Sequence, residues 1–333
     1  MYSVSNSNTM KGSDLRTAAQ LLESGQLVAI PTETVYGLAA NALNEEAVLK
    51  IYEVKNRPQF NPLIIHVASF DDVKNWVKCI PADAEKLAEA FWPGALTLLL
   101  EKNALIPDLV TAGHSRVAIR IPDHPLTLEL LKQLDFPLAA PSANPSGYVS
   151  PTSAEHVYAG LNGKIPYILD GGVCSVGLES TIVGCYENGE TVIYRLGGIS
   201  KEAIEKVLGK QVVIAASITQ DPSAPGMLKS HYATVTPLHA GGIPDLLKAF
   251  PDKKAVIINY NHYYPNYPTH LQYILTPNND HYEAARNLFR ILREADQQNA
   301  DIILAEYAPA HGIGLAINDR IERARHLWKE SAD

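Results

Sequence analysis

The chain has 333 residues, of which 46% are hydrophobic and 19% charged, a balance typical of a globular enzyme with material for two domains. Its net charge of −8 at pH 7 disfavours a broad nucleic-acid-binding surface. No apolar run reaches the ~20 residues that span a bilayer, the N-terminus lacks a secretory signal pattern, and the three cysteines form no C-x-x-C pair. We therefore expect a cytoplasmic protein with reduced thiols.

Residues 27–67 predict a strand, a polar turn, a helix and a second strand. The strand Leu27–Ile30 runs into a turn rich in hydroxyl groups, and Asn44 is a favourable N-cap for the helix that follows. Pro58 predicts that this helix ends before it. Five polar or charged side chains thus fall at element ends, where open α/β folds usually hold their ligands: Thr34, Lys55, Arg57, Asn61 and His66.

Lys55 and Arg57 also have a simpler interpretation, because basic residues are common in the last turn of a helix and complement its dipole. Taken as an isolated K-x-R, the pair favours this interpretation. We expect both side chains to be surface charges, so that removing either changes the free energy of unfolding by less than ~0.5 kcal/mol.

Helices and strands continue to about residue 210, and Asn188-Gly189 predicts the turn of a β-hairpin. Helices are expected over Phe70–Val77, Ala82–Phe91, Leu126–Leu134, Ala154–Ala159 and Lys201–Leu208. Strands are expected over Ala95–Leu100, Arg116–Ile121, Phe136–Ala140, Tyr167–Asp170, Ile182–Tyr186 and Thr191–Arg195.

The strand Arg116–Ile121 alternates with period two, which places Arg116, Ala118 and Arg120 on one face. A half-exposed strand with two solvated arginines is one interpretation. The small Ala118 leaves room for a ligand, however, and two guanidinium groups on one face can bind a phosphate and a carboxylate.

The loops 141–147 and 171–181 are rich in Ser, Asn and Gly, and exposed hydroxyls and backbone N–H groups suit a nucleotide, although such clusters are also ordinary turns. The P-loop, Rossmann, H-E-x-x-H, G-x-S-x-G and Cys/His metal patterns are absent. In an acidic domain, the cations at element ends favour a nucleotide phosphate as ligand: Lys55, Arg57, Arg116, Arg120 and Arg195.

A change of composition over residues 211–238 predicts a linker that is long enough to act as an active-site lid. The βα rhythm resumes in residues 239–333 and predicts a small doubly wound α/β domain, whose role the sequence does not reveal. Its expected elements are the helices Ile243–Phe250 and Tyr282–Ala295, the strands Ala255–Tyr260, Leu271–Leu275 and Asp301–Ala305, and a helix after Ala316.

The motif PTETVYGL at 31–38, followed by K-x-R at 55–57 and N-P-L-x-x-H at 61–66, resembles the YrdC-type threonylcarbamoyl-AMP synthases of tRNA modification. The similarity extends through 116–122, 139–147 and 177–184, and the linker is similar to that of the long, two-domain subgroup. The resemblance implies an α/β fold in which residues 1–210 form a twisted mixed sheet around a concave catalytic pocket. A smaller, Rossmann-like C-terminal α/β domain follows.

Members of this family join L-threonine, bicarbonate and ATP into threonylcarbamoyl-AMP and release pyrophosphate. The resemblance implies the same substrates here, with Mg²⁺ accompanying ATP and held mostly by substrate oxygens and water. Partner proteins would then carry the threonylcarbamoyl group to adenosine 37 of tRNAs that read ANN codons, with at most weak direct contact between this chain and tRNA.

The resemblance also assigns residues, because threonine needs a cation for its carboxylate and ATP needs charge neutralisation. The implied threonine subsite consists of Thr34, His66, Arg120, the backbone near Ala140, and Ser180. The implied ATP subsite consists of Lys55, Arg57, Asn61, Arg116, Ser142, Asn144, Ser150, Arg195 and Tyr232. Lys55 and Arg57 are the predicted catalytic residues, acting by positioning and charge stabilisation, and no residue is predicted to ligate a metal.

Two other functions are compatible with the same kind of domain. An RNA-binding module would contact tRNA without chemistry, and the acidic balance of the chain counts against it. The carbamoyl-transfer protein of hydrogenase maturation contains a related domain, but it also carries zinc-finger cysteine pairs, which this chain lacks.

Overall fold

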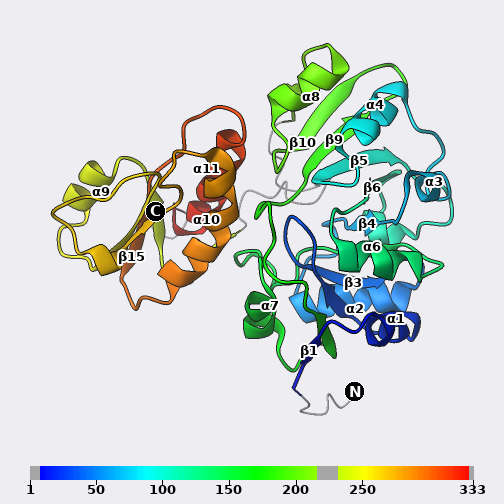
Figure 1. Ribbon diagram of the computed structural model, residues 1–333, viewed down its shortest axis with the longest axis horizontal. Helices are drawn as coiled ribbons and strands as arrows, with labels where there is room; N and C mark the ends of the chain where they lie inside the picture. Colours follow the sequence, from blue (N-terminus) through cyan, green and yellow to red (C-terminus); the bar gives the residue numbers. More distant parts are fainter. Residues whose placement is uncertain (1–7, 216–231, 330–333) are drawn as a thin grey trace.

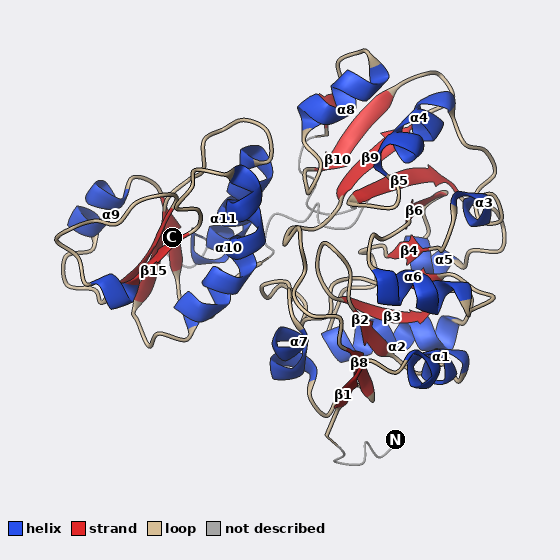
Figure 2. Ribbon diagram, viewed as in Figure 1, coloured by secondary structure: helices blue, strands red, loops and turns tan. Residues whose placement is uncertain are grey.

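The computed structural model describes residues 8–215 and 232–329, which form two α/β units side by side (Figures 1 and 2). Within these ranges the first unit contains an eleven-stranded sheet. Its strands are β1 (Met10–Gly12), β2 (Val28–Ile30), β3 (Gly37–Asn41), β4 (Ile64–His66), β5 (Leu96–Glu101), β6 (Arg116–Arg120), β7 (Leu138–Ala139), β8 (Tyr167–Leu169), β9 (Thr181–Cys185), β10 (Thr191–Arg195) and β11 (Val213–Ile214).

The order of strands in this sheet is β1-β8-β2-β3-β7-β4-β6-β5-β9-β10-β11. Strands β2, β3, β7 and β4 make successive antiparallel pairs, whereas β4 pairs with β6, and β5 with β9, in parallel. The predicted mixed sheet is therefore confirmed. Neighbouring strands that run in opposite directions bring loops from distant parts of the chain to one region of the sheet.

Polar caps fix where the helices of the first unit begin. The side chain of Asn44 accepts a hydrogen bond from the backbone N–H of Ala47, and those of Ser153 and Ser200 accept equivalent bonds three residues on. The helices are α1 (Leu15–Glu23), α2 (Glu45–Lys55), α3 (Phe70–Val73), α4 (Ala82–Phe91), α5 (Asp108–Thr111), α6 (Pro125–Lys132), α7 (Ala154–Leu161) and α8 (Lys201–Leu208).

The turn after β2 does not lead directly into a helix, as the sequence predicted, but into β3. The sequence of β3, GLAAN, has small residues, low strand propensity and no period-two alternation, so the pattern gave no sign of a strand. Pairing on both sides, with β2 and with β7, stabilises it in the fold. The helix α1 and the strand β1 were also not predicted, and α3 is shorter than the expected Phe70–Val77.

The second unit has a four-stranded sheet of order β12-β15-β13-β14, in which every neighbouring pair is parallel. This confirms the predicted Rossmann-like unit. In Figure 1, α10 and α11 lie on the side of this sheet that faces the first unit, and α9 lies on the far side. The elements are β12 (Leu238–Ala240), α9 (Ile243–Ala249), β13 (Ala255–Asn259), the 3₁₀ turn Thr269–Leu271, β14 (Gln272–Ile274), α10 (His281–Asp296), β15 (Ile302–Ala305) and α11 (Gly314–Lys329).

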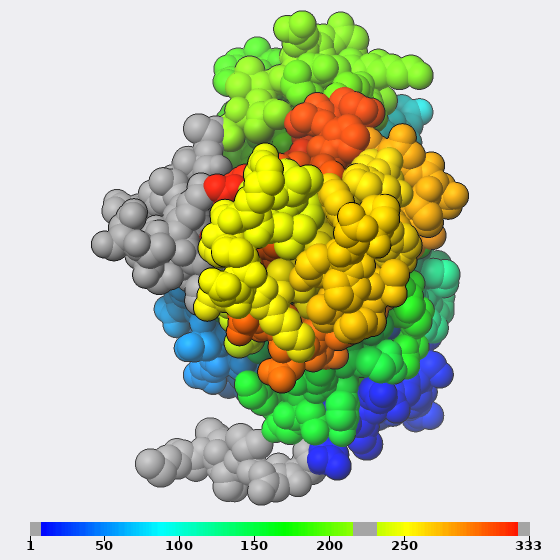
Figure 3. Space-filling model, turned by 90° about the vertical axis from the view of Figure 1, so that its left-hand side faces the viewer, coloured from blue at the N-terminus to red at the C-terminus, as the bar shows by residue number. Residues whose placement is uncertain are grey.

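One apolar cluster spans the two units, so they share part of a core. Val35, Val149 and Leu178 of the first unit belong to the same cluster as Phe289 and other residues of α10 and α11. Gly177 lies so close to α10 that an added Cβ would come within 2.4 Å of the Cα of Arg286, and its φ of +78° also favours glycine. In Figure 3, the yellow and orange surface of the second unit stands in front of green segments of the first.

The predicted linker, 211–238, is described only in part. Strand β11 pairs with β10 of the first sheet and β12 pairs with β15 of the second, while most of the predicted lid lies outside the described residues. In the described part of the chain, no helix is both long enough and apolar enough to cross a bilayer.

Candidate active site

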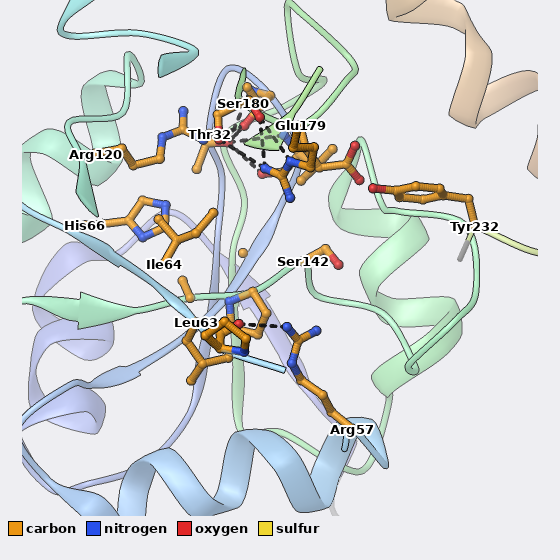
Figure 4. A pocket seen from close by; sticks show the side chains of 17 residues that line it. Thr32, Arg57, Leu63, Ile64, His66, Arg120, Ser142, Glu179, Ser180 and Tyr232 are labelled. Atoms are coloured by element: carbon orange, nitrogen blue, oxygen red, sulfur yellow. Dashed lines mark hydrogen bonds between the residues drawn. The ribbon is translucent and has the colours of Figure 1, made fainter. Parts of the chain in front are cut away.

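A concave pocket opens in the first unit, where loops from several strands meet (Figure 4). Its walls come from the turn after β2, the segment between α2 and β4, the end of β6, and the loops beside β7, β9 and β10. The lining residues are Thr32, Thr34, Val35, Gly37, Arg57, Pro62, Leu63, Ile64, His66, Arg120, Ala140, Pro141, Ser142, Glu179, Ser180, Arg195 and Tyr232.

The turn after β2 is held by its own hydroxyl groups. Thr32 Oγ1 lies 2.6 Å from the carbonyl oxygen of Val35, to which it donates, and accepts from the backbone N–H groups of Thr34 and Val35. Thr34 Oγ1 lies 2.8 Å from Thr32 Oγ1. The turn therefore presents the predicted Thr34 to the pocket in a fixed orientation.

Arg120 ends β6 and points at the same turn. Its Nη1 donates to Thr34 Oγ1 at 3.0 Å, and its Nη2 makes a buried ion pair with Glu33. The other carboxylate oxygen of Glu33 accepts from the backbone N–H of Asp123. Arg120 Nε has no hydrogen-bond partner among the described residues, so one donor of this guanidinium is left for a ligand.

His66 lies beside Arg120, because the two residues are register partners in the parallel pair of β4 and β6. Burial, together with the charge of Arg120, lowers the pKa of His66 to about 3. Its imidazole is therefore neutral at physiological pH. No described residue hydrogen-bonds to its Nδ1, so a ligand can form the missing bond.

Two further arginines, Arg57 and Arg195, line the pocket. Arg57 donates from Nη2 to the carbonyl oxygen of Pro62 at 2.9 Å, and Arg195 donates from Nη2 to both the carbonyl oxygen and Oγ of Ser180, at 2.9 and 3.2 Å. Burial lowers the pKa of each to about 10, so both remain cations at neutral pH. Ser180 Oγ also lies 2.7 Å from Thr97 Oγ1.

Lys55 is 1% exposed and lies behind the pocket wall rather than in it. Its Nζ donates to the carbonyl oxygens of Ser142, at 2.6 Å, and Asn144, which holds the predicted nucleotide loop against α2. Burial, and then the charge of Arg57, lowers the pKa of Lys55 well below its ordinary value.

The expectation that Lys55 and Arg57 are surface charges is wrong, since both side chains are buried. Lys55 lies on the buried face of α2, one turn after Ile51, and the left-handed conformation of Asn56, with φ of 52°, then ends the helix and turns the chain before Arg57. A sequence pattern cannot distinguish this turn from an exposed helix end.

Three other predicted ATP residues are buried next to the pocket without lining it. Asn61 accepts from Arg57 through its backbone carbonyl, Asn144 donates to the backbone of Pro145 and Tyr148, and Ser150 Oγ donates to Glu179 at 2.6 Å. They support lining residues, and their direct contact with ATP stays a prediction.

Arg116 lies apart from the pocket. Its Nη2 lies 2.6 Å from the carbonyl oxygens of both Leu99 and Cys185, and its guanidinium is 3.9 Å from the centre of the Tyr186 ring. It lines a different hollow. Arg116 and Arg120 are four residue steps apart along an extended strand, a distance of about 13 Å. The period-two pattern of β6 placed Arg116 and Arg120 on one face, but it did not predict that only Arg120 reaches the pocket.

Two carboxylates of the site were not predicted. Glu33 neutralises Arg120, and Glu179 lines the pocket and accepts from Arg320 of α11. Their positions next to Thr34 and Ser180 were the only sequence signal. Cys174 is buried outside the lining, and burial raises the pKa of its thiol to about 12.

The described residues contain no group of three His, Cys, Asp or Glu side chains that could hold a metal ion. Both carboxylates at the pocket are already paired with arginines. The site therefore does not fit a Mg²⁺ ion held by protein ligands. It fits an anionic ligand, which three buried guanidinium groups, hydroxyl groups and a neutral imidazole can hold and whose developing charge they can stabilise.

Two protein-family models match the chain. The model described as telomere recombination (Sua5/YciO/YrdC) matches residues 20–197, and the model described as threonylcarbamoyl-AMP synthase, C-terminal domain, matches residues 199–325. The chain is 42% identical to the threonylcarbamoyl-AMP synthase of Pyrococcus abyssi, covering 93% of both chains. It is also 42% identical to that of Bacillus subtilis, covering 92% of this chain and 91% of the relative.

Solved structures agree with these matches. The crystal structure of P. abyssi Sua5 complexed with L-threonine superposes with a TM-score of 0.86 at 40% identity, covering 95% of this chain and 96% of that one. E. coli YciO, at 17% identity and a TM-score of 0.51, shares the fold of the first unit.

Proposed function

The chain belongs to the threonylcarbamoyl-AMP synthase family, and we propose that it joins L-threonine, bicarbonate and ATP into threonylcarbamoyl-AMP with release of pyrophosphate. The observation that carries this proposal is the meeting of Arg57, Arg120 and Arg195 in one pocket with the hydroxyl groups of Thr34 and Ser180. Such a pocket suits a substrate pair with a carboxylate, a hydroxyl and a polyphosphate.

The reaction needs two bond-forming steps. The amine of threonine and bicarbonate give a carbamate and water; a carbamate oxygen then attacks the α-phosphorus of ATP, and the bond to pyrophosphate breaks. Neither step requires a covalent enzyme group, so positioning and electrostatic stabilisation carry the catalysis.

We assign the threonine carboxylate to Arg120, whose Nε is unpartnered within the described residues, and the threonine hydroxyl to the neighbouring Thr34 and His66. A threonine complex of the P. abyssi relative supports this amino acid as substrate. Arg57 and Arg195, on the other walls, are then available to the phosphates. Mg²⁺, as a companion of ATP coordinated by phosphate oxygens and water, stays a prediction.

The product would serve the threonylcarbamoylation of adenosine 37 in tRNAs that read ANN codons, through separate transferase proteins that accept the adenylate. Weak direct tRNA contact and a cytoplasmic setting also stay predictions. The acidic net charge of −8 favours a role in making the intermediate rather than in holding tRNA tightly.

The test is incubation of the full chain with ATP, L-threonine and bicarbonate, followed by mass spectrometry for the adenylate and an assay for pyrophosphate. We expect pyrophosphate release to require both threonine and bicarbonate. Robust turnover with threonine omitted would indicate a generic nucleotidase and overturn the proposal.

A further inference from the structure

Arg320 of α11 reaches from the second unit into the wall of the pocket. It is fully buried, and its Nε lies 3.0 Å from Glu179 Oε2. Its Nη2 donates to the carbonyl oxygen of Leu196 at 2.8 Å, and its Nη1 pairs with Asp319 at 2.6 Å. Arg320 thus has three hydrogen-bonded partners, and two of them, Glu179 and Leu196, belong to the first unit.

The partner carboxylate, Glu179, belongs to the lining of the pocket. Its other oxygen accepts from Ser150 Oγ at 2.6 Å, so Arg320 and Ser150 hold the carboxylate from two sides. The next residue, Ser180, receives the hydrogen bonds of Arg195. Because Glu179 and Ser180 are joined by one peptide bond, a displacement of Glu179 also shifts Ser180, to which Arg195 is hydrogen-bonded.

A second lining residue also depends on the second unit. The ring of Tyr232 stacks on Phe289 of α10, with centroids 5.3 Å apart, and lies 5.1 Å from the guanidinium of Arg320. The φ of Tyr232 is +67°, a left-handed conformation that a tyrosine adopts only when its surroundings hold it there. Phe289 and Arg320 contact the ring, while the next residue, Ala233, donates its backbone N–H to the carbonyl oxygen of Gly147 at 2.8 Å.

We propose that Arg320 is a positioning residue, through which the second unit fixes the Glu179 carboxylate and the Tyr232 ring in the walls of the active-site pocket. This inference rests on the proposed function. The positive charge of Arg320 also reduces the repulsion between the Glu179 carboxylate and anionic substrates in the pocket. The second unit thereby becomes part of the substrate site without contacting substrate itself.

The chain offers a matched control in Arg293 of α10. It too is a buried arginine of the second unit that contacts the first, with 5% exposure. It donates to the backbone carbonyl oxygens of Val149 and Ser150 and lies over the Tyr148 ring, and none of these three residues lines the pocket. Losing it removes an inter-unit arginine but leaves Glu179 and Tyr232 in contact with Arg320. Its bond to Ser150 is to the backbone carbonyl oxygen at 3.4 Å, so the Ser150 hydroxyl that holds Glu179 is not a partner of Arg293.

The experiment measures KM for threonine and for ATP, kcat, and thermal stability in the full chain for Arg320→Met, Arg320→Lys and Arg293→Met. We expect Arg320→Met to lower kcat/KM by roughly 10- to 100-fold, mainly through KM, because the binding walls are misplaced before chemistry begins. Arg293→Met should lower the Tm yet keep both KM values within about twofold of wild type. Arg320→Lys should recover part of the loss, since it keeps the charge but not the planar fork.

A purely structural role predicts something else: a smaller active fraction, hence a lower apparent kcat, with KM unchanged. That pattern in Arg320→Met, or equal KM effects in Arg293→Met and Arg320→Met, would overturn the proposal. Should Arg320→Met fail to fold, Arg320→Lys and Glu179→Gln are measured instead. Positioning then predicts raised KM in both single variants and less than multiplicative losses when they are combined, and independent losses would contradict it.

A readout without substrate separates this proposal from the proposed function. The backbone N–H of Gly198 donates to the carbonyl oxygen of Glu179 at 3.0 Å, so its amide exchange reports on that peptide. Faster exchange at Gly198 in Arg320→Met than in Arg293→Met supports positioning even if wild type makes no adenylate. Equal exchange in both variants counts against positioning, even if wild type is fully active.

Discussion

Two regions of this molecule bury basic side chains in opposite ways. At the end of α2, Lys55 and Arg57 donate only to backbone carbonyl oxygens in the described structure, and burial lowers the pKa of both. In α11, Arg320 contacts Glu179 and Asp319. Burial alone would lower its pKa, but Tyr232 and the two carboxylates outweigh burial and raise it.

The difference indicates what each region is for. A buried cation without a carboxylate partner carries a desolvation cost that an anionic ligand can offset, so it is suited to binding. A buried cation with two carboxylate partners is already neutralised, so it is suited to holding other groups in place. Arg57 combines this property with a place in the pocket lining, so it faces substrate, whereas Arg320 organises the wall. Lys55 and Arg293 also donate to backbone carbonyl oxygens, but they lie outside the lining and hold loops.

The largest effect on stability should come from breaking the neutralised pair. Arg320→Met removes a buried ion-pair partner of Glu179, which we expect to lower the free energy of unfolding by roughly 3–5 kcal/mol. Denaturant unfolding followed by circular dichroism measures this value. Adding Glu179→Gln to Arg320→Met should restore part of the stability. If the free energy of unfolding of Arg320→Met alone lies within about 1 kcal/mol of wild type, the value of about one hydrogen bond, the contrast between the two regions is wrong.

Arg57, the cation in the pocket, should show a small effect on stability and a large effect on activity when it is replaced. We expect Arg57→Ala to lower kcat/KM by roughly 10²- to 10³-fold, because it removes charge stabilisation of the transferring phosphate. Its free energy of unfolding should change by only about 1 kcal/mol, since the lost hydrogen bonds are offset by relief of desolvation. Near-normal adenylate synthesis by this variant, measured by the pyrophosphate assay, would mean that Arg57 does not contact phosphate.

Lys55 gives the same contrast a pH dependence. Because burial lowers its pKa in the folded state, the unfolded chain binds more protons wherever the pH lies between that lowered pKa and 10.5. The stability cost of burying the charged form is present at lower pH and is relieved as the pH rises through this window. Relative to Lys55→Met, wild type should therefore gain stability with rising pH. A constant difference between the two proteins from pH 7 to pH 10 would show that Lys55 is not desolvated.

The smallest effect is expected at Arg116, which the sequence grouped with Arg120 but which lies in another hollow. We expect Arg116→Gln to keep kcat/KM within about threefold of wild type and to lower the Tm slightly, because it loses contacts with backbone carbonyl groups and the Tyr186 ring. Steady-state kinetics beside Arg57→Ala provide the comparison. A loss of kcat/KM as large as that of Arg57→Ala would indicate that Arg116 does contribute to the ATP site.

Much of this protein was determined by local sequence. Strands and helices with clear periodicity or caps, such as α2 behind Asn44 and the hairpin around Asn188-Gly189, form where the pattern predicted them. The family motifs also pointed to residues that do meet in one pocket: Thr34, Arg57, His66, Arg120, Ala140, Ser142, Ser180, Arg195 and Tyr232. These features depend on short-range backbone preferences or on motifs of a few residues, and both can be recognised within a short stretch of sequence.

Only the tertiary structure decided the rest. It made a strand of Gly37–Asn41, which has weak strand propensity, by pairing it on both sides, and it turned Lys55 inward to hold the loop at Ser142. It separated Arg116 from Arg120 and brought Arg320 to Glu179 across 141 positions of sequence. Such contacts follow from how strands are ordered and how the two units pack. No local pattern contains that information, because the energy that selects it comes from burial and pairing between distant segments.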